Sequence, residues 1–365
     1  MIKFLDLQQQ YLSIKDEIDS AIQSVIGSAA FIGGEYVVKF EQAFGDYQQA
    51  KHCIGVGNGT DALEIVIEGL SLPKESEIIV PANSFIASAE AVTRTGHRVV
   101  FCDCDPDTYT ISPSSILSKI TSKTKAIMAV HLYGQPCEMD EIMSIAQAYG
   151  LYVIEDCAQA HGAEYKGQRV GTFGVAGTFS FYPGKNLGAF GDAGAIVTNN
   201  SELAETCRMI ANHGRLQKYN HAFEGRNSRL DGLQAAILMV KLKHLPTWIR
   251  RRRAVAQYYE ENLLLGPELI LPKELTECES VYHLYVIRTS ERDALQQFLH
   301  TNGVQTGIHY PISLPKLKAY EYCCQGEEDF VANNFDSQYL SLPIGEHLSE
   351  EQVAQVVNKV KAFFL

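Results

Sequence analysis

The sequence contains no apolar run long enough to cross a membrane. Its longest apolar stretches, such as residues 126–130, are far shorter than the roughly 20 residues that a membrane-spanning helix needs. Residues 1–20 mix Lys3, Asp6 and Lys15 with apolar residues and lack the apolar core of a secretion signal. We therefore expect a soluble, cytoplasmic protein with no membrane partner.

Positive charge is also scarce. The 365 residues include 31 lysines and arginines against 43 aspartates and glutamates, which gives a formal charge of −12. Nucleic acids and anionic membranes bind clustered basic side chains, so we expect no nucleic-acid partner. An anionic ligand would need positive groups gathered at its own site. The short basic run at 250–253 is interpreted as a solvated face or an ion-pair site between domains.

No cysteine pair has the usual spacing of a zinc site. The nine cysteines include no Cys-x-x-Cys, and Cys102-x-Cys104 and Cys323-Cys324 are spaced too tightly. We therefore expect no metal site and reduced, mostly structural thiols. A hydrophobic content of 46%, with 28 glycines and 12 prolines, excludes disordered and collagen-like chains and predicts a globular protein.

Short apolar runs alternate with amphipathic stretches between residues 53 and 199. The runs are rich in β-branched residues and end at turn or polar residues, which is typical of buried strands. Successive strand and helix units predict a mostly parallel sheet with helices on both faces. Strands are expected at 77–81, 98–102, 125–131, 151–156, 178–181 and 193–198, and helices at 60–70, 85–95 and 138–149.

The pattern changes after residue 229. A helical segment runs to Leu245, and Pro246 is expected to begin a second helix that extends to residue 265. A strand at 281–289, a helix at 291–302, a loop rich in proline and glycine, and a terminal helix from 349 follow. We therefore predict a large α/β domain of residues 1–245 and a smaller α+β domain of residues 246–365.

Residues 55–61, Gly-Val-Gly-Asn-Gly-Thr-Asp, connect a short predicted strand to a helix. Backbone N–H groups at such a helix start can bind a phosphate. The Gly-x-Gly-x-x-Gly dinucleotide pattern would need a glycine at Thr60, and the Gly-Lys-Ser/Thr ending of a P-loop is missing. The segment is therefore interpreted either as a phosphate site or as an ordinary strand-to-helix turn.

Two charged residues stand where ligands of such sheets bind, beyond the carboxyl ends of the strands. Asp156 ends one strand, and Lys185 lies in a glycine-flanked loop after the next apolar strand. A lysine in such a loop is usually solvated, yet the surrounding turn residues would return its amine to the sheet edge. A desolvated lysine has a lowered pKa and can form a Schiff base. With a phosphate loop, these are the parts that hold pyridoxal 5′-phosphate, whose ring nitrogen the aspartate keeps protonated.

Several motifs, in order along nearly the whole chain, resemble the pyridoxal-phosphate sugar aminotransferases of the DegT/DnrJ/EryC1/StrS family. The resemblance implies a fold-type I, aspartate aminotransferase-like transferase with a mostly parallel mixed sheet in the large domain and a smaller α+β C-terminal domain. It also implies a homodimer with active sites shared across the interface. The motifs are Phe31-Ile-Gly-Gly, Gly57-Asn-Gly-Thr-Asp-Ala-Leu63, His131-Leu-Tyr-Gly-Gln135, residues 155–163, residues 179–188, and Gly225-Arg-Asn-Ser-Arg229 followed by Gln234-Ala-Ala236.

The resemblance assigns the site residues one by one. Lys185 matches the Schiff-base lysine and Asp156 the partner of the pyridine nitrogen, so both are predicted to be catalytic. Phe85 matches the aromatic residue that stacks on the pyridine ring, although an aromatic residue opening a helix is otherwise a core residue. Gln159 matches the residue near the cofactor hydroxyl. Contacts to the phosphate are expected from Gly59, Thr60, Asp61 and Ser180 and, from the other subunit, Asn227.

The same resemblance bears on the substrate. Residues 179–188 together with Gln-Ala-His-Gly at 159–162 are similar to the branch that aminates C3 of dTDP-linked 3-keto-6-deoxyhexoses. The C4 branch usually differs at Tyr182 and after Pro183. Glutamate is the amino donor that the family implies.

Four further residues are candidate substrate contacts. His161 and Tyr182 would lie near the sugar, although His161 would equally cap a strand end and Tyr182 would equally pack. The diphosphate needs cations in an acidic protein, and Arg215 and Arg229 cluster with Lys218 and Arg226 in the segment expected at the interface. Each of these cations alone would also be explained as a solvated side chain.

Other functions are weighed against this assignment. Amination at C4 is one alternative, and a non-catalytic regulatory protein that binds pyridoxal phosphate is another, which the complete residue set opposes without excluding it. The sugar dehydratases of the family resemble this chain but have histidine where Lys185 stands. A nicotinamide oxidoreductase is disfavoured because its fingerprint fails at Thr60.

Overall fold

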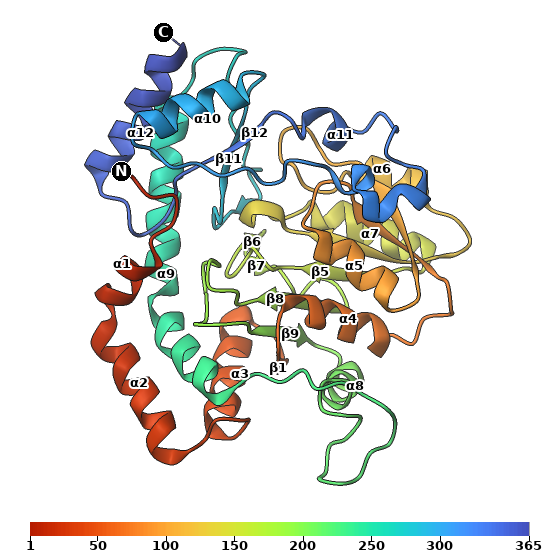
Figure 1. Cartoon of the computed structure of the whole chain (residues 1–365). Coiled ribbons are helices and arrows are strands. Elements are labelled where there is room, and N and C mark those ends of the chain that lie inside the picture. Colours follow the sequence, from red (N-terminus) through yellow and green to blue (C-terminus); the bar gives the residue numbers. More distant parts are fainter. Residues whose placement is uncertain (365) are drawn as a thin grey trace.

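A seven-stranded sheet forms the centre of the larger part of the protein (Figure 1). The structure is a computed structural model that describes residues 1–364. The strand order is β1-β9-β8-β5-β4-β2-β3, and β9 is antiparallel to both of its neighbours while the other pairs are parallel. The predicted mostly parallel mixed sheet is therefore confirmed. The strands are β1 (His52–Val56), β2 (Glu77–Pro81), β3 (Arg98–Cys102), β4 (Thr124–Val130), β5 (Tyr152–Asp156), β8 (Ala176–Ser180) and β9 (Gly194–Thr198).

Helices cover both faces of this sheet, as the pattern predicted. Alternate residues of the strands face opposite ways, so Ile78 packs in one core cluster and Ile79 in another. On the first face lie α4 (Gly59–Gly69), α5 (Ile86–Arg94) and α8 (Ser201–Ala211). On the other face lie α3 (Glu35–Gln48), α6 (Pro113–Lys119), α7 (Met139–Tyr149) and part of α9 (Gly232–Asn262).

A second core lies in the C-terminal part. Strands β11 (Tyr285–Arg288) and β12 (Tyr339–Leu342) pair antiparallel, and α10 (Arg292–Thr301) and α12 (Glu350–Phe364) pack against them. Ile2 also belongs to this core and forms a parallel bridge with Val304. The first residues of the chain therefore pack with the last third of it.

Helix α9 joins the two cores, because its first half packs with the sheet and its second half with the C-terminal core (Figure 1). The prediction that Pro246 begins a new helix is wrong, since Pro246 lies inside α9. Proline costs a helix one hydrogen bond and a steric clash. Here Pro246 is exposed, and Leu245 and Trp248 on either side of it are buried. Packing of the flanking turns offsets that cost, and the domain division at residue 245 stays a prediction.

The remaining elements surround these two cores. The N-terminal helices are α1 (Leu7–Ser13) and α2 (Lys15–Ser28), and α2 packs along α9. Short pieces complete the fold: β6 (Glu164–Tyr165), β7 (Gln168–Arg169), β10 (Cys278–Glu279), α11 (Val331–Phe335), and the 3₁₀ turns η1 (Leu132–Gly134), η2 (Leu314–Lys316) and η3 (Lys318–Cys323).

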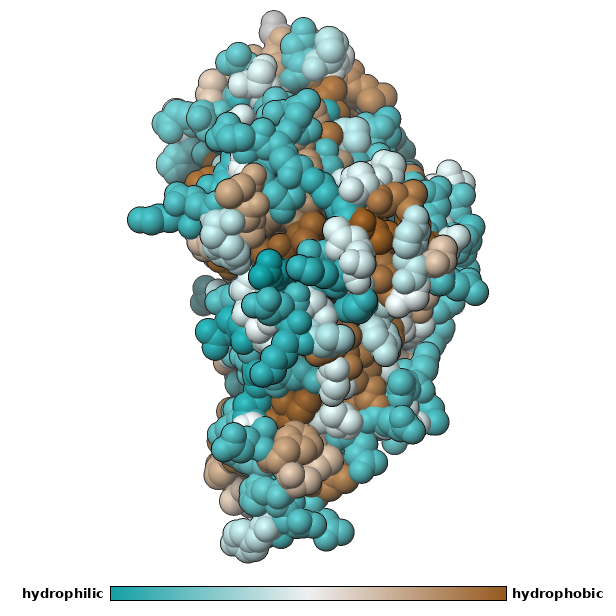
Figure 2. Space-filling model, turned by 90° about the vertical axis from the view of Figure 1, so that its right-hand side faces the viewer, coloured by the Kyte–Doolittle hydropathy of each residue, from teal (hydrophilic) through white to brown (hydrophobic). Residues whose placement is uncertain are grey.

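Hydrophilic and hydrophobic residues are mixed on the face of the protein that Figure 2 shows, and most of the thiols are buried. Within residues 1–364, no helix combines the length and apolar composition needed to cross a bilayer. All nine cysteines are free, and only Cys323 and Cys324 are not buried.

Candidate active site

A cavity of about 660 Å³ opens at the carboxyl ends of β5 and β8. Asp156 is the last residue of β5 and Ser180 the last residue of β8, so the sheet edge brings both to the cavity wall. Other walls come from the N-terminal segment and the C-terminal part. Eight of the predicted site residues line it: Gly59, Thr60, Phe85, Asp156, Gln159, Ser180, Tyr182 and Lys185.

The predicted phosphate loop meets Ser180 directly. A Cβ atom added to Gly59 would lie 2.7 Å from the Ser180 Cβ, so only glycine allows this close approach. Asn58 caps α4, because its side chain accepts a hydrogen bond from the Asp61 N–H. The first N–H groups of α4, which have no acceptor within a helix, begin at the cavity wall beside the Ser180 hydroxyl. This concave set of donors suits a phosphate.

Asp156 is held as an acceptor. Its Oδ2 accepts a hydrogen bond from the Ser88 hydroxyl at 2.7 Å, and its Oδ1 accepts one from the Ala158 N–H at 3.1 Å. The Ser84 and Ser88 hydroxyl oxygens are 2.7 Å apart, so Ser84 supplies the hydrogen once Ser88 has donated its own to the carboxylate. These bonds fix the carboxylate at the cavity wall, where it can pair with a protonated ring nitrogen.

Lys185 brings an amine of lowered pKa to the cavity. Burial lowers its pKa to about 8, and the charge of Asp156 opposes that effect in part. Histidines nearby do not add positive charge. Burial, followed by the charge of Lys185, lowers the pKa of His309 to about 4 and that of His283 well below its ordinary value. The cavity wall around the amine is therefore lined by neutral imidazoles at physiological pH.

Phe85 and Gln159 also line the cavity. Phe85 is 53% exposed and faces the cavity, so it is not a core residue. Its ring lies 5.7 Å from that of Tyr310. Gln159 is fixed by two bonds, since its Oε1 accepts from the Tyr133 N–H at 2.6 Å and its Nε2 donates to the Tyr310 hydroxyl at 3.2 Å.

His161 does not fit its predicted role as a sugar contact. It is fully buried and does not line the cavity, and its Nε2 donates to the Ser180 carbonyl at 2.9 Å. Burial, followed by the charge of Lys185, lowers its pKa to about 3, so the ring is neutral. The alternative interpretation, in which His161 fixes a strand end, is the one that the structure favours. Asp61 also lies outside the cavity lining, and its N–H is taken by Asn58.

Three predicted residues lie away from this cavity. Asn227 is exposed and forms a bridge with Asn212, and Arg215 and Arg229 are partly buried. None of the three lines the cavity within one chain. Arg226 from the same basic cluster is already engaged, because it forms ion pairs with Glu64 and Glu68. The remaining members stay predictions for a site shared with a second subunit.

The sequence pattern missed several cavity residues. His283, His309, Tyr310 and Arg252 come from the C-terminal part, far along the chain from Lys185. No local motif marks them, because only the long-range packing brings them to the sheet edge. Ser88 had a local signal, since it lies one helical turn after Phe85 at the start of α5 and therefore on the same side.

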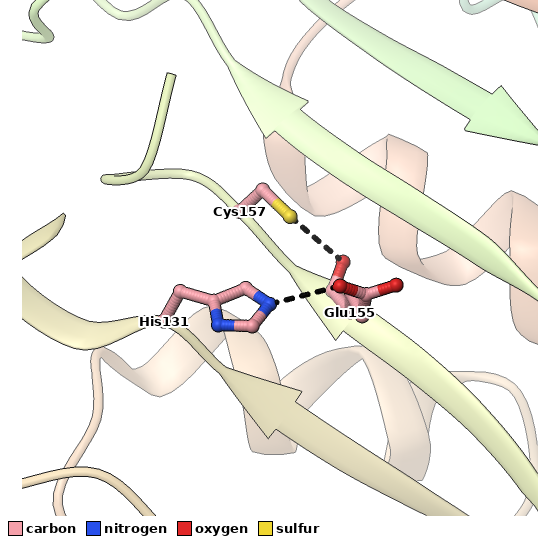
Figure 3. Close-up of side chains that lie close together, drawn as sticks. All are labelled: His131, Glu155 and Cys157. Carbon is pink, nitrogen blue, oxygen red and sulfur yellow. Dashed lines mark hydrogen bonds and ion pairs between the residues drawn. The ribbon is translucent and has the colours of Figure 1, made fainter. Parts of the chain in front are cut away.

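A buried cluster of His131, Glu155 and Cys157 has the residue types of a metal site (Figure 3). Hydrogen bonds explain it without a cation. Glu155 accepts from the N–H groups of residues 171, 173 and 174 at 2.6–2.8 Å and from His131 Nε2 at 3.0 Å. The other ring nitrogen of His131 accepts from the Cys137 N–H at 3.0 Å. The cluster therefore anchors the loop after β7 to β5.

Replacing Glu155 should destabilise the fold. Glu155→Ala leaves the Gly171 N–H and the His131 N–H buried without an acceptor and the N–H groups of residues 173 and 174 partly buried without one, at about 1–3 kcal/mol for each buried group. We expect the free energy of unfolding, measured by chemical denaturation of the cofactor-free protein, to fall by at least about 3 kcal/mol. The exposed Glu141→Ala is the matched control. A loss of under about 1 kcal/mol, or stabilisation by Zn²⁺ that needs Glu155, would show that the cluster is not this anchor.

The donor set of the cavity fits pyridoxal phosphate. Ser180 and the start of α4 suit its phosphate, Asp156 its ring nitrogen, Phe85 its ring face and Lys185 its aldehyde. The close approach of Gly59 to Ser180 forms the cradle that a side chain at position 59 would fill.

Comparison with known proteins agrees with this fit. A sequence profile of the DegT/DnrJ/EryC1/StrS aminotransferase family matches residues 12–361. A dTDP-3-amino-3,6-dideoxy-alpha-D-galactopyranose transaminase of Aneurinibacillus thermoaerophilus is 48% identical over 363 residues, which cover 100% of this chain and 99% of the relative. A pleiotropic regulatory protein of Geobacillus stearothermophilus is 44% identical over 366 residues, covering 100% and 98%.

The fold gives the same result. A crystal structure of S. venezuelae DesV in complex with a ketimine intermediate superposes with a TM-score of 0.97 at 41% identity, covering 100% of this chain and 98% of the other. The chain therefore belongs to the DegT/DnrJ/EryC1/StrS aminotransferase family, as a pyridoxal-phosphate-dependent sugar-nucleotide aminotransferase.

Proposed function

We propose that the protein transfers the amino group of glutamate to C3 of a dTDP-linked 3-keto-6-deoxyhexose, giving a dTDP-3-amino-3,6-dideoxyhexose. The observation that carries this proposal is the cavity itself, in which the Lys185 amine, with its pKa lowered to about 8, and the Asp156 carboxylate stand in one wall. The choice of C3 is supported by the 48% identity to a transaminase whose name specifies a dTDP-3-amino sugar.

Pyridoxal phosphate, when bound, supplies an aldehyde that takes up an amino group and a ring that accepts electrons from a neighbouring bond. The residues of this chain hold it at four places. The start of α4 and Ser180 would bind the phosphate, Phe85 would cover one ring face, and Asp156 would keep a proton on the ring nitrogen. Lys185 would be the amine that holds the aldehyde end of the cofactor.

Lys185 also moves the proton that transamination requires. An amine with a pKa near 8 is partly neutral at physiological pH, so it can take a proton from the α-carbon of the amino donor and return it at the cofactor C4′ atom. The same amine serves the reverse transfer on the sugar. Tyr182, which is 60% exposed at the cavity wall, is the proposed contact to the sugar.

In this proposal, a second subunit completes the contacts to the diphosphate of the substrate and to the phosphate of the cofactor. Asn227, Arg215 and Arg229 lie outside the cavity of their own chain. In a two-fold dimer each residue that crosses the interface does so twice, so these three would complete the partner's site.

Two alternatives compete with this proposal. A relative at 44% identity is named as a pleiotropic regulatory protein, but the family is one of aminotransferases, and the two residues proposed to be catalytic, Lys185 and Asp156, line one cavity here. Amination at C4 is the other alternative. The first experiment therefore distinguishes amination at C3 from amination at C4.

The substrate test offers the enzyme two sugar nucleotides separately. With glutamate present, we expect the dTDP-linked 3-keto-6-deoxyhexose to be aminated and the 4-keto isomer to react poorly, with the product carbon assigned by NMR. Lys185→Ala is the control and should abolish turnover. Exclusive reaction of the 4-keto sugar would move the protein to the C4 branch, and turnover of neither would leave the regulatory alternative.

The pKa of Lys185 predicts how the cofactor-free protein takes up pyridoxal phosphate. Only the neutral amine attacks the aldehyde, and with a pKa of about 8 half of Lys185 is neutral at pH 8, against about 0.3% of an ordinary lysine. The uptake rate, followed by visible absorption, should fall about tenfold per unit below pH 8 and level off above it. A rate that still rises between pH 9 and 10 would contradict the lowered pKa.

Mixed dimers test the shared site. One subunit carries Lys185→Ala and the other Asn227→Asp, whose carboxylate should repel the phosphate. If residue 227 serves the partner's site, one site of a mixed dimer has both changes and the other has neither. Mixed dimers should then recover about half of the wild-type activity, although both parents are nearly inactive. If residue 227 serves its own chain, every site has one change and mixing recovers nothing.

A further inference from the structure

Helix α9 has two fully buried cations on one side. Lys241 and Arg252 are eleven positions apart, about three helical turns, so they project in nearly the same direction. Their exposed fractions are only 1% and 3%. A buried charge is costly, and apolar side chains of similar volume often stabilise a fold as well. The two cations therefore require an explanation beyond stability.

Lys241 holds the loop that carries Lys185. Its Nζ donates to the carbonyl of Gly188 at 2.7 Å, three residues after Lys185, and to Gln10 Oε1 at 2.8 Å. The remaining side of the ammonium group faces the ring of Phe190, 4.7 Å away. Each side of the Lys241 ammonium group thus has a partner.

The bonds continue from Gln10 to the C-terminal core. Gln10 Nε2 donates to Glu346 Oε1 at 2.6 Å, and Glu346 Oε2 lies 3.5 Å from Arg252 Nη2. Arg252 Nη1 donates to the carbonyls of Tyr282, His283 and Ile344 at 3.1–3.2 Å. This part of the network joins α1, α9 and the segments around 283 and 345.

The network then returns to the lysine loop. His283 Nδ1 donates to Asn186 Oδ1 at 3.0 Å, and Asn186 Nδ2 donates to the Val281 carbonyl at 3.1 Å. Asn186 follows Lys185 directly. The loop is therefore held on both sides of position 187 by one closed ring of buried and partly buried polar contacts.

We propose that Lys241 is a positioning residue for Lys185, which acts by holding the Gly188 carbonyl and so fixing the Lys185 loop against the C-terminal core. Gln10 assists by joining Lys241 to Glu346. This inference rests on the proposed role of Lys185 as the amine that binds the cofactor.

The test compares Lys241→Met with Lys243→Met, the same change at an exposed position of the same helix. In the cofactor-free protein, we expect the loop amides of Lys185 and Ala189 to exchange at least about tenfold faster in Lys241→Met than in the unmodified protein. The exchange rates of the amides in the sheet should not change. In the loaded enzyme, kcat should fall on the order of 10- to 100-fold, because a small misplacement of a reacting group is costly. The KM for glutamate should change much less, and the pH midpoint of the visible absorption should shift.

Gln10→Met provides a second variant if Lys241→Met does not fold, and it should change the same three quantities in the same direction. Unchanged local exchange, pH midpoint and kcat, with only a lower melting temperature, would overturn the proposal and leave a purely structural lysine. Lys185→Ala is measured in parallel. If that variant keeps the visible absorption, the proposed role of Lys185 is wrong, whereas loss there with no effect of Lys241→Met rejects the positioning role alone.

Discussion

The alternation of side chains along β5 is the constraint on which the site depends. Glu155 and Asp156 are neighbours, so they point to opposite sides of the sheet. Glu155 accepts hydrogen bonds from three backbone N–H groups and from His131, which fixes the end of the strand. Asp156 is thereby held at the cavity wall, where Ser88 donates to it. One carboxylate maintains the scaffold, and the adjacent one is the group proposed to pair with the ring nitrogen of the cofactor.

The histidines close to Lys185 are neutral because burial lowers their pKa. The chain carries a formal charge of −12. At this site burial is the dominant influence, and it lowers the pKa of Lys185 and of the surrounding histidines. Neutral imidazoles can hold backbone and side-chain groups without repelling the amine, as His161 does with the Ser180 carbonyl and His283 with Asn186. Buried histidines near a reactive lysine therefore act as fixed hydrogen-bond donors rather than as charges.

Local pattern was enough to predict the sheet and the parts of the site at its edge. The bounds of β2 and β3 were predicted without error, and Asp156 and Lys185 line one cavity as expected. Helix α9 was misjudged because tertiary packing on both sides of Pro246 outweighs the local cost of proline. For His161 the sequence left two roles open, because a motif gives a residue's place in the chain and not the direction of its side chain. Tyr310 and Arg252 were missed because no local spacing links them to Lys185.

The site residues that the sequence predicted and those that it missed are positioned by different parts of the fold. The groups proposed to act on the cofactor lie at strand ends and helix starts, where hydrogen-bond geometry is set within a few residues. The groups on the opposite wall depend on how α9 and the C-terminal core are joined to the sheet. In the proposed function, those walls would surround the space for the amino donor and the sugar. Relatives that share the local motifs are therefore expected to differ in substrate mainly through residues such as those around 283 and 309, whose positions depend on packing over long sequence distances.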